Sequence, residues 1–88
     1  MVVAFIMIKV GTGELMAWLK SVKEKVSKVH GVKEVYSILG RYDIMAKVEA
    51  KSVEELTNIV VDGIRSVPGV LTTETFLVAI PAERTARL

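Results

Sequence analysis

The hydrophobic positions of this chain first form a continuous run and then a helical stripe. Residues 2–10 are almost all β-branched or otherwise apolar, and the run ends at a glycine-containing segment, residues 11–13. Such a run predicts a central β-strand covered on both faces. Apolar residues then recur at helical spacing up to His30, with lysines and glutamates between them. The members of this stripe are Leu15, Trp18, Leu19, Val22, Val26 and Val29.

The remaining hydrophobic segments are shorter and are separated by turn residues. A short turn at residues 40–43 joins two of them and predicts an antiparallel hairpin. Ser52 and Glu55 form a capping box, which marks the start of a second helix. The predicted elements are strands over residues 32–39, 44–50 and 70–80, and a helix that begins after Ser52 and ends at Pro68.

The chain also repeats itself at a fixed offset. Residues 29–32 read Val-His-Gly-Val, and residues 67–70 read Val-Pro-Gly-Val. Two copies of a strand-helix-strand unit predict an α+β fold, the ferredoxin-like βαββαβ sandwich, with both helices on one face. The first and third strands should be central. We expect one domain over residues 1–80 and a polar C-terminal tail over residues 81–88.

The repeat also assigns side chains to the two faces of the sheet. Matching positions should point together toward the helices: Ile6, Ile8, Val10, Ile44, Ala46 and Val48. The face without helices then carries Phe5, Met7 and Met45, with Lys47 and Glu49 at the rim. An apolar patch of this kind would be unfavourable in water. We therefore predict that it packs on the identical sheet of a second chain.

Composition supports this expectation and excludes several classes of function. Hydrophobic residues make up 51% of 88 residues, more than a small monomer can bury. The net charge is +2 and the lysines alternate with glutamates, so neither nucleic acid nor a membrane is an expected partner. The absence of cysteine excludes disulfides and thiolate metal sites. We expect a cytoplasmic protein without a signal peptide, metal or cofactor.

Candidate catalytic groups are few. His30, Asp43, Asp62, Tyr36 and Tyr42 do not combine by spacing into a nucleophile, a base and an orienting group, so we expect no enzyme activity and no catalytic residues. His30 is expected at a turn. The segment 11–13 is interpreted as a turn with Thr12 as a helix N-cap, because it lacks the length and the lysine of a phosphate-binding loop.

The turn Gly40-Arg41-Tyr42-Asp43, called the hinge below, carries the most distinctive chemistry. It brings a guanidinium, a phenol and a carboxylate to one end of a hairpin. Its backbone and its carboxylate could hold the two charged ends of a zwitterion. The alternative is that Asp43 only caps the backbone of its own turn. The threonines of the last strand, Thr73 and Thr75 among them, suit a strand by β-branching, with a ligand contact as the other interpretation.

These segments together resemble a known family. The apolar first strand, Gly31-Val32-Lys33-Glu34-Val35-Tyr36, the hinge, Val67-Pro68-Gly69-Val70 and Thr73-Glu74-Thr75 resemble the effector-binding (RAM) domain of Lrp/AsnC transcription regulators. The resemblance covers nearly the whole of residues 2–80. It implies a dimer of face-to-face sheets that assembles further, often to octamers, and binds free amino acids between dimers.

The resemblance also assigns site residues. Gly40, Tyr42 and Asp43 match the family hinge that contacts the amino and carboxylate groups of the effector. Arg41 would bear on side-chain selectivity, and Thr73 and Thr75 would have a weaker pocket role. Because only Met1 precedes Val2, the chain resembles a stand-alone form without the helix-turn-helix domain. We expect it to act by binding an amino acid, and to modulate full-length regulators by co-assembly.

Two other functions remain open at this stage. Dimeric ferredoxin-like proteins include small monooxygenases, whose chemistry takes place between helices and sheet. The chain could also be a purely structural assembly module, in which Asp43 only caps its own turn. ACT domains share the same fold and the same kind of pattern.

Overall fold

A computed structural model describes residues 1–11 and 15–79, without the side chains of residues 15–18. The predictions for Thr12, for the side chains of Leu15 and Trp18, and for the tail 81–88 lie outside the described residues. The elements in chain order are β1 (Val2–Val10), α1 (Leu15–Ser27), β2 (Val32–Ser37), β3 (Ile44–Ala50), α2 (Val53–Asn58), the π-helix η1 (Ile59–Ile64) and β4 (Val70–Leu77).

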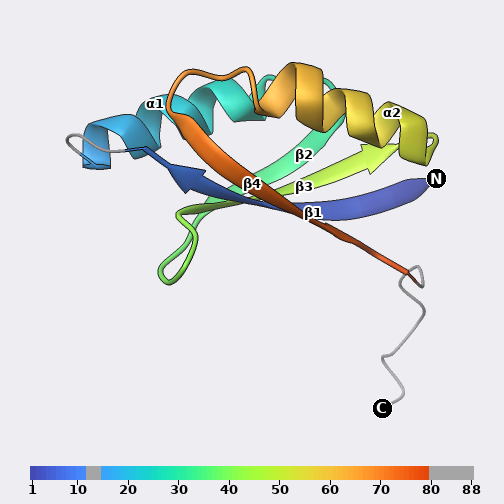
Figure 1. The fold of residues 1–88 in the computed structure, drawn as a ribbon, viewed down its shortest axis with the longest axis horizontal. Helices are drawn as coiled ribbons and strands as arrows, with labels where there is room; N and C mark the ends of the chain where they lie inside the picture. The colour runs from blue at the N-terminus through green and yellow to red at the C-terminus, as the bar shows by residue number, and fades with distance from the viewer. Residues whose placement is uncertain (12–14, 80–88) are drawn as a thin grey trace, which may run out of the picture.

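The described strands form one sheet in the order β2-β3-β1-β4, and every neighbouring pair is antiparallel. The helices lie on one side of this sheet (Figure 1). This arrangement confirms the ferredoxin-like α+β fold, and it confirms that the first and third strands are central.

Burial alternates along the central strands because successive side chains of a strand point to opposite faces. Ala4, Ile6, Ile8 and Val10 of β1 are buried under the helices, whereas Phe5 and Met7 are only partly covered. In β3, every second residue from Ile44 to Ala50 is buried in the same way. The prediction that β1 is covered on both faces is therefore wrong for a single chain, because one face of the sheet carries no helix.

The hydrophobic core confirms the face assignment made from the repeat. The six positions expected to face the helices are all buried. The helices contribute Val22 and Val26 from α1 and Val60 and Ile64 from η1, at equivalent positions of the two repeats. The core residues of the described chain are all hydrophobic, and no buried polar side chain lies among them.

Two strand boundaries and the geometry of the second helix differ from the prediction. The strand expected over residues 32–39 ends at Ser37, because the N–H of Ile38 donates to the carbonyl of Asp43 (2.9 Å) and closes the hairpin loop. β4 ends at Leu77. The second helix changes to π geometry at Ile59, and the N–H of Arg65 donates to the carbonyl of Val60 (2.8 Å), five residues earlier.

Candidate functional site

The hinge lies in the loop that connects β2 to β3, which projects beyond the sheet (Figure 1). Gly40 has φ of +135°, and a Cβ built there would meet nothing within 4 Å. Arg41 is exposed, whereas Tyr42 and Asp43 are partly buried. The backbone of the hinge therefore needs a glycine for its conformation and not for packing.

Asp43 fastens the hinge to the neighbouring strand. Its N–H donates to the carbonyl of Ile8 (2.9 Å), and its Oδ2 accepts a hydrogen bond from the N–H of Val10 (2.8 Å). The β1–β3 ladder ends at the pair Ile8 and Ile44. The N–H of Val10 lies beyond the end of the β1–β3 ladder and has no backbone acceptor on β3. The side chain of Asp43 provides this acceptor instead.

The Asp43 carboxylate also has a cation beside it. Lys9 Nζ lies 3.7 Å from Oδ2, and the Asp43 side chain is 13% exposed. Within the described hydrogen bonds, Oδ1 has no protein donor. Among the described residues, the Asp43 carboxylate therefore does not cap its own turn. It caps the backbone of β1 through Oδ2 and leaves Oδ1 for another donor.

Tyr42 makes the second contact between the hinge and the sheet. Its hydroxyl donates to the carboxylate of Glu74 on β4. This hydrogen bond is the main reason that the pKa of Tyr42 is raised above its ordinary value. Burial and the negative charge of Glu74 raise the pKa further, and Arg41 opposes them. The hinge is therefore connected to β4 as well as to β1.

Replacing Glu74 with glutamine is expected to lower the pKa of Tyr42 toward its ordinary value. The phenolate absorbance of the two tyrosines, titrated with pH, measures this change. Tyr36 gives an internal control, because its own pKa is raised by a hydrogen bond to Glu34 (2.5 Å), which the variant leaves in place. Since the folded pKa of Tyr42 is raised, its stabilising effect should be present below about pH 10 and lost as the pH rises through the folded pKa. An unchanged titration of both tyrosines would contradict the pairing with Glu74.

The structure separates the two groups of predicted site residues. Thr73 and Thr75 pair with Ile8 and Ile6 of β1, whose side chains face the helices, and both threonines line a groove beside α2. Glu74, the partner of Tyr42, points to the opposite face. A single chain therefore brings Tyr42 and Asp43 together at the hinge, but it places the threonines on the other side of the sheet.

Two residues of the site were missed by sequence reasoning. Lys9 and Glu74 contact the hinge from β1 and β4, although they are more than thirty residues from it in the chain. The alternation of faces along each strand was available as a signal. The sequence did not give the strand register, which determines which residues of β1 and β4 lie beside Tyr42 and Asp43.

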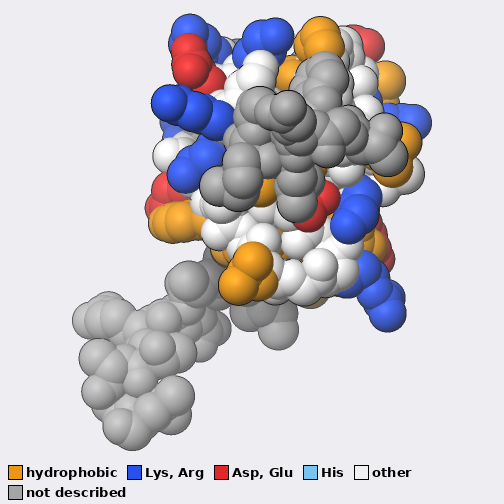
Figure 2. Space-filling view, turned by 90° about the vertical axis from the view of Figure 1, so that its left-hand side faces the viewer, with side chains coloured by type: hydrophobic (Ala, Val, Ile, Leu, Met, Phe, Trp, Pro, Cys, Tyr) orange, Lys and Arg blue, Asp and Glu red, His pale blue; other side chains and the backbone are white. Residues whose placement is uncertain are grey.

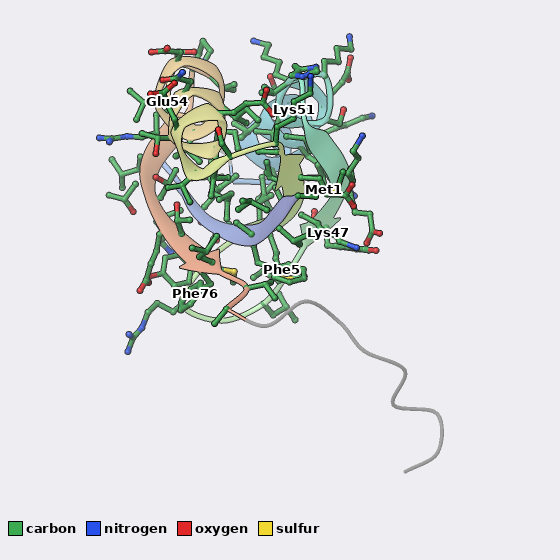
Figure 3. The ribbon with its side chains drawn as sticks, turned by 90° about the vertical axis from the view of Figure 1, so that its right-hand side faces the viewer. Met1, Phe5, Lys47, Lys51, Glu54 and Phe76 are labelled. Atoms are coloured by element: carbon green, nitrogen blue, oxygen red, sulfur yellow. The ribbon has the colours of Figure 1, made fainter. Side chains whose placement is uncertain are left out.

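The side of the sheet away from the helices, called the open face below, has an apolar centre and a charged surround. Phe5, Met7 and Met45 are partly exposed at the centre. Figure 3 shows Phe5 and Phe76 below the sheet, on adjacent strands in register. The residues around the centre are Lys9, Glu34, Tyr36, Lys47, Glu74 and Phe76. At the rim, Nζ of Lys47 lies 3.9 Å from Oε2 of Glu34.

The other candidate chemistry adds little to this picture. His30 is exposed at the turn between α1 and β2, as predicted. Across residues 1–11 and 15–79, no three His, Cys, Asp or Glu side chains come together in a way that could hold a metal. No helix in this part of the chain combines the length and the apolarity needed to cross a bilayer.

Figure 2 shows Lys and Arg at several places around one end of the molecule, with Asp and Glu among them.

Comparison with solved structures agrees with the fold. A Thermus thermophilus protein, TTHA0845, is 37% identical, with a TM-score of 0.85, and the match covers 96% of this chain and 100% of that chain. AsnC of Escherichia coli is 28% identical, with a TM-score of 0.82, over 96% of this chain and 55% of AsnC. The fold is therefore that of the ligand-binding half of a class of transcription regulators.

Sequence comparison gives the family. The pattern described as the Lrp/AsnC ligand binding domain matches residues 3–85. The chain belongs to this family, as its hinge and repeat predicted.

Curated relatives include a different kind of protein. The homocitrate synthase of Sulfurisphaera tokodaii is 46% identical over 65 residues, which are 74% of this chain and only 14% of that enzyme. The match therefore spans only a small part of the length of that enzyme.

Proposed function

We propose that the protein is a homo-oligomeric effector-binding module that binds a free amino acid at the hinge and has no catalytic step of its own. The hinge offers donors and an acceptor in one place. The N–H groups of Gly40, Arg41 and Tyr42 take no part in the described backbone hydrogen bonds, and Oδ1 of Asp43 has no protein donor there. Free N–H groups suit an α-carboxylate, and a partly buried carboxylate suits an α-ammonium group.

This arrangement is the observation that carries the proposal. An amino acid bound here would present its carboxylate to the turn and its ammonium group to Asp43. Lys9 lies beside the same carboxylate, so the ammonium group would share or replace that ion pair. A regulator from Neisseria meningitidis, NMB0573, which shares only the fold at 18% identity (TM-score 0.81, over 99% of this chain and 55% of that one), was crystallised in complex with L-Met.

The second part of the proposal is assembly through the open face. Two copies packed face to face would cover Phe5, Met7 and Met45, which are only partly covered in one chain. The charged residues around them would remain at the rim, where ion pairs stay hydrated. Dimers would then associate further, toward an octamer, and complete the amino-acid sites with residues of neighbouring subunits. Co-assembly with full-length Lrp/AsnC regulators would use the same open face.

An Asp43→Asn variant is expected to weaken amino-acid binding by about tenfold or more, because it removes the charge that faces the ammonium group. The amide oxygen of asparagine can still accept the hydrogen bond from Val10, so the fold should be retained. Calorimetry with each of the twenty amino acids, methionine included, identifies the ligand and then measures the loss.

A matched control distinguishes binding from folding. Asp43→Ala should lose the same affinity and also destabilise the fold by about 1 kcal/mol, because the N–H of Val10 loses its acceptor. If no amino acid binds the wild-type protein at millimolar concentration, the proposed ligand is wrong. If Asp43→Asn binds as well as the wild type, the proposed position of the site is wrong.

A second candidate function is regulation of a biosynthetic enzyme. The homocitrate synthase relatives favour it, because in those enzymes the matching segment lies within the same polypeptide. The module would then transmit amino-acid binding to an enzyme. An amino-acid-dependent change in the activity of such an enzyme when the module is added distinguishes this function from the control of a transcription regulator.

A further inference from the structure

A groove lies between β4 and the helical segment formed by α2 and η1. Its volume is about 380 Å³, within the usual range of small-ligand pockets of about 300–1,000 Å³. Val53, Leu56 and Val60 line it from the helical side, and Thr73, Thr75 and Leu77 line it from β4. The groove is on the helical side of the sheet and is therefore separate from the open face.

The groove exists because the helices do not cover β4. Within the sheet, α2 contacts mainly β3 and β1. Ile6 and Ile8 on β1 are fully buried, but Thr75 and Thr73, which lie opposite them on β4, are not. Val53 is 55% exposed and Leu77 is 48% exposed. Apolar side chains therefore remain open to solvent beside two hydroxyl groups.

The two ends of the groove differ in polarity. η1 leads through a short turn into β4, so the helical segment and β4 run in opposite directions. Arg65, at the end of η1, therefore lies at the same end as Thr73, near the start of β4. Val53 and Leu77 lie at the other end. One end thus offers a guanidinium and a hydroxyl, and the other offers aliphatic surface.

The charges of the groove select a ligand class. Arg65 lines it, and in the described part of the chain its guanidinium forms no ion pair. No carboxylate belongs to the described lining, so an ammonium group would have no partner. The hydroxyls of Thr73 and Thr75 make no hydrogen bond among the described residues and can donate to an anion.

We propose that this groove is a second ligand site, for a short aliphatic carboxylate that lacks an amino group, such as a branched 2-oxo acid. The carboxylate would lie against Arg65 and Thr73, and the aliphatic chain against Val53, Leu56 and Leu77. The site does not depend on the hinge, because it lies on the other side of the sheet. The protein would then bind an amino acid and a deaminated acid at different places.

Titration with 4-methyl-2-oxopentanoate, followed by the amide chemical shifts of the protein, tests the proposal. We expect saturable shifts at Thr73, Thr75 and Val60, and leucine should not produce them. Arg65→Gln should weaken binding about tenfold or more, because a charge-assisted hydrogen bond is lost. Arg41→Gln is the matched control, because it removes an exposed arginine that lies at the hinge and not in the groove. It should change the affinity for 4-methyl-2-oxopentanoate by less than about twofold.

Three results would overturn the groove site. The first is an absence of saturable shifts in the wild-type protein up to about 20 mM ligand. The second is unchanged binding in Arg65→Gln. The third is binding that is lost in Arg41→Gln or Asp43→Asn but kept in Arg65→Gln, because it would place the acid at the hinge. The first two results leave the proposed amino-acid site untouched, because Asp43→Asn tests that site separately with amino acids as ligands.

Discussion

A Met7→Glu variant is expected to be monomeric at concentrations at which the wild-type protein forms the proposed face-to-face dimer. Met7 lies at the centre of the open face, in register with Met45 on β3 and with Glu74 on β4. Face-to-face packing would bury the new carboxylate beside an existing one, which costs several kcal/mol without a partner. The dissociation constant of the dimer should rise at least about a hundredfold. Light scattering across a range of protein concentrations measures it.

The variant needs a control that adds the same charge elsewhere. Val53→Glu serves this purpose, because Val53 is 55% exposed in the first turn of α2, on the helical side of the sheet. An acidic residue is tolerated at a helix N-terminus. This control should keep the mass of the wild-type protein. A dimer that persists unchanged in Met7→Glu would show that the open face is not the interface.

The largest loss of stability from a single methyl group is expected in Gly31→Ala. Gly31 has φ of +91°, where an L-residue is strained by about 1–2 kcal/mol. A Cβ would also lie 2.6 Å from Cδ1 of Ile59 and 3.1 Å from the carbonyl oxygen of Glu49, and overpacking adds about 1–3 kcal/mol. The free energy of unfolding should therefore fall by about 2–5 kcal/mol. Urea denaturation at a fixed protein concentration measures this loss.

Gly40→Ala separates the two causes. Gly40 also has positive φ, +135°, but a Cβ there meets nothing within 4 Å. Its cost should be limited to backbone strain, about 1–2 kcal/mol. If both variants lose the same stability, steric conflict with Ile59 and with the carbonyl oxygen of Glu49 contributes nothing at Gly31. The close approach of these two residues is then not the reason for that glycine.

The sequence was sufficient for the fold because two kinds of pattern agreed. Alternation in β3 and the repeat in the helices assigned the same residues to the core, and Val26 and Ile64 are both fully buried. The repeated turn is also real, since Gly31 and Gly69 have φ of +91° and +100°. The π geometry of η1 was not predicted, because a change from α to π hydrogen bonding leaves no signal in hydrophobic spacing.

The candidate site was only partly predictable. The hinge was found because its residues are adjacent in the chain. The hydrogen bond between Asp43 and Val10 depends on where the β1–β3 ladder ends, and the pairing of β1 with β4 shifts register between Lys9 and Val10. The resemblance gave Thr73 and Thr75 a weaker pocket role, and within one chain their position in β4 places them on the helical side of the sheet, away from the hinge.

The contact between Asp43 and Lys9 has a consequence for how binding is measured. Lys9 belongs to the same strand face as Met7, so one carboxylate joins the hinge to the edge of the open face. A ligand that takes over this carboxylate would alter the charge at that edge. Ligand binding and subunit association would then be thermodynamically linked, and each would shift the other by the same factor. An affinity measured for this protein would hold only for a stated protein concentration, and dilution itself would act as an effector.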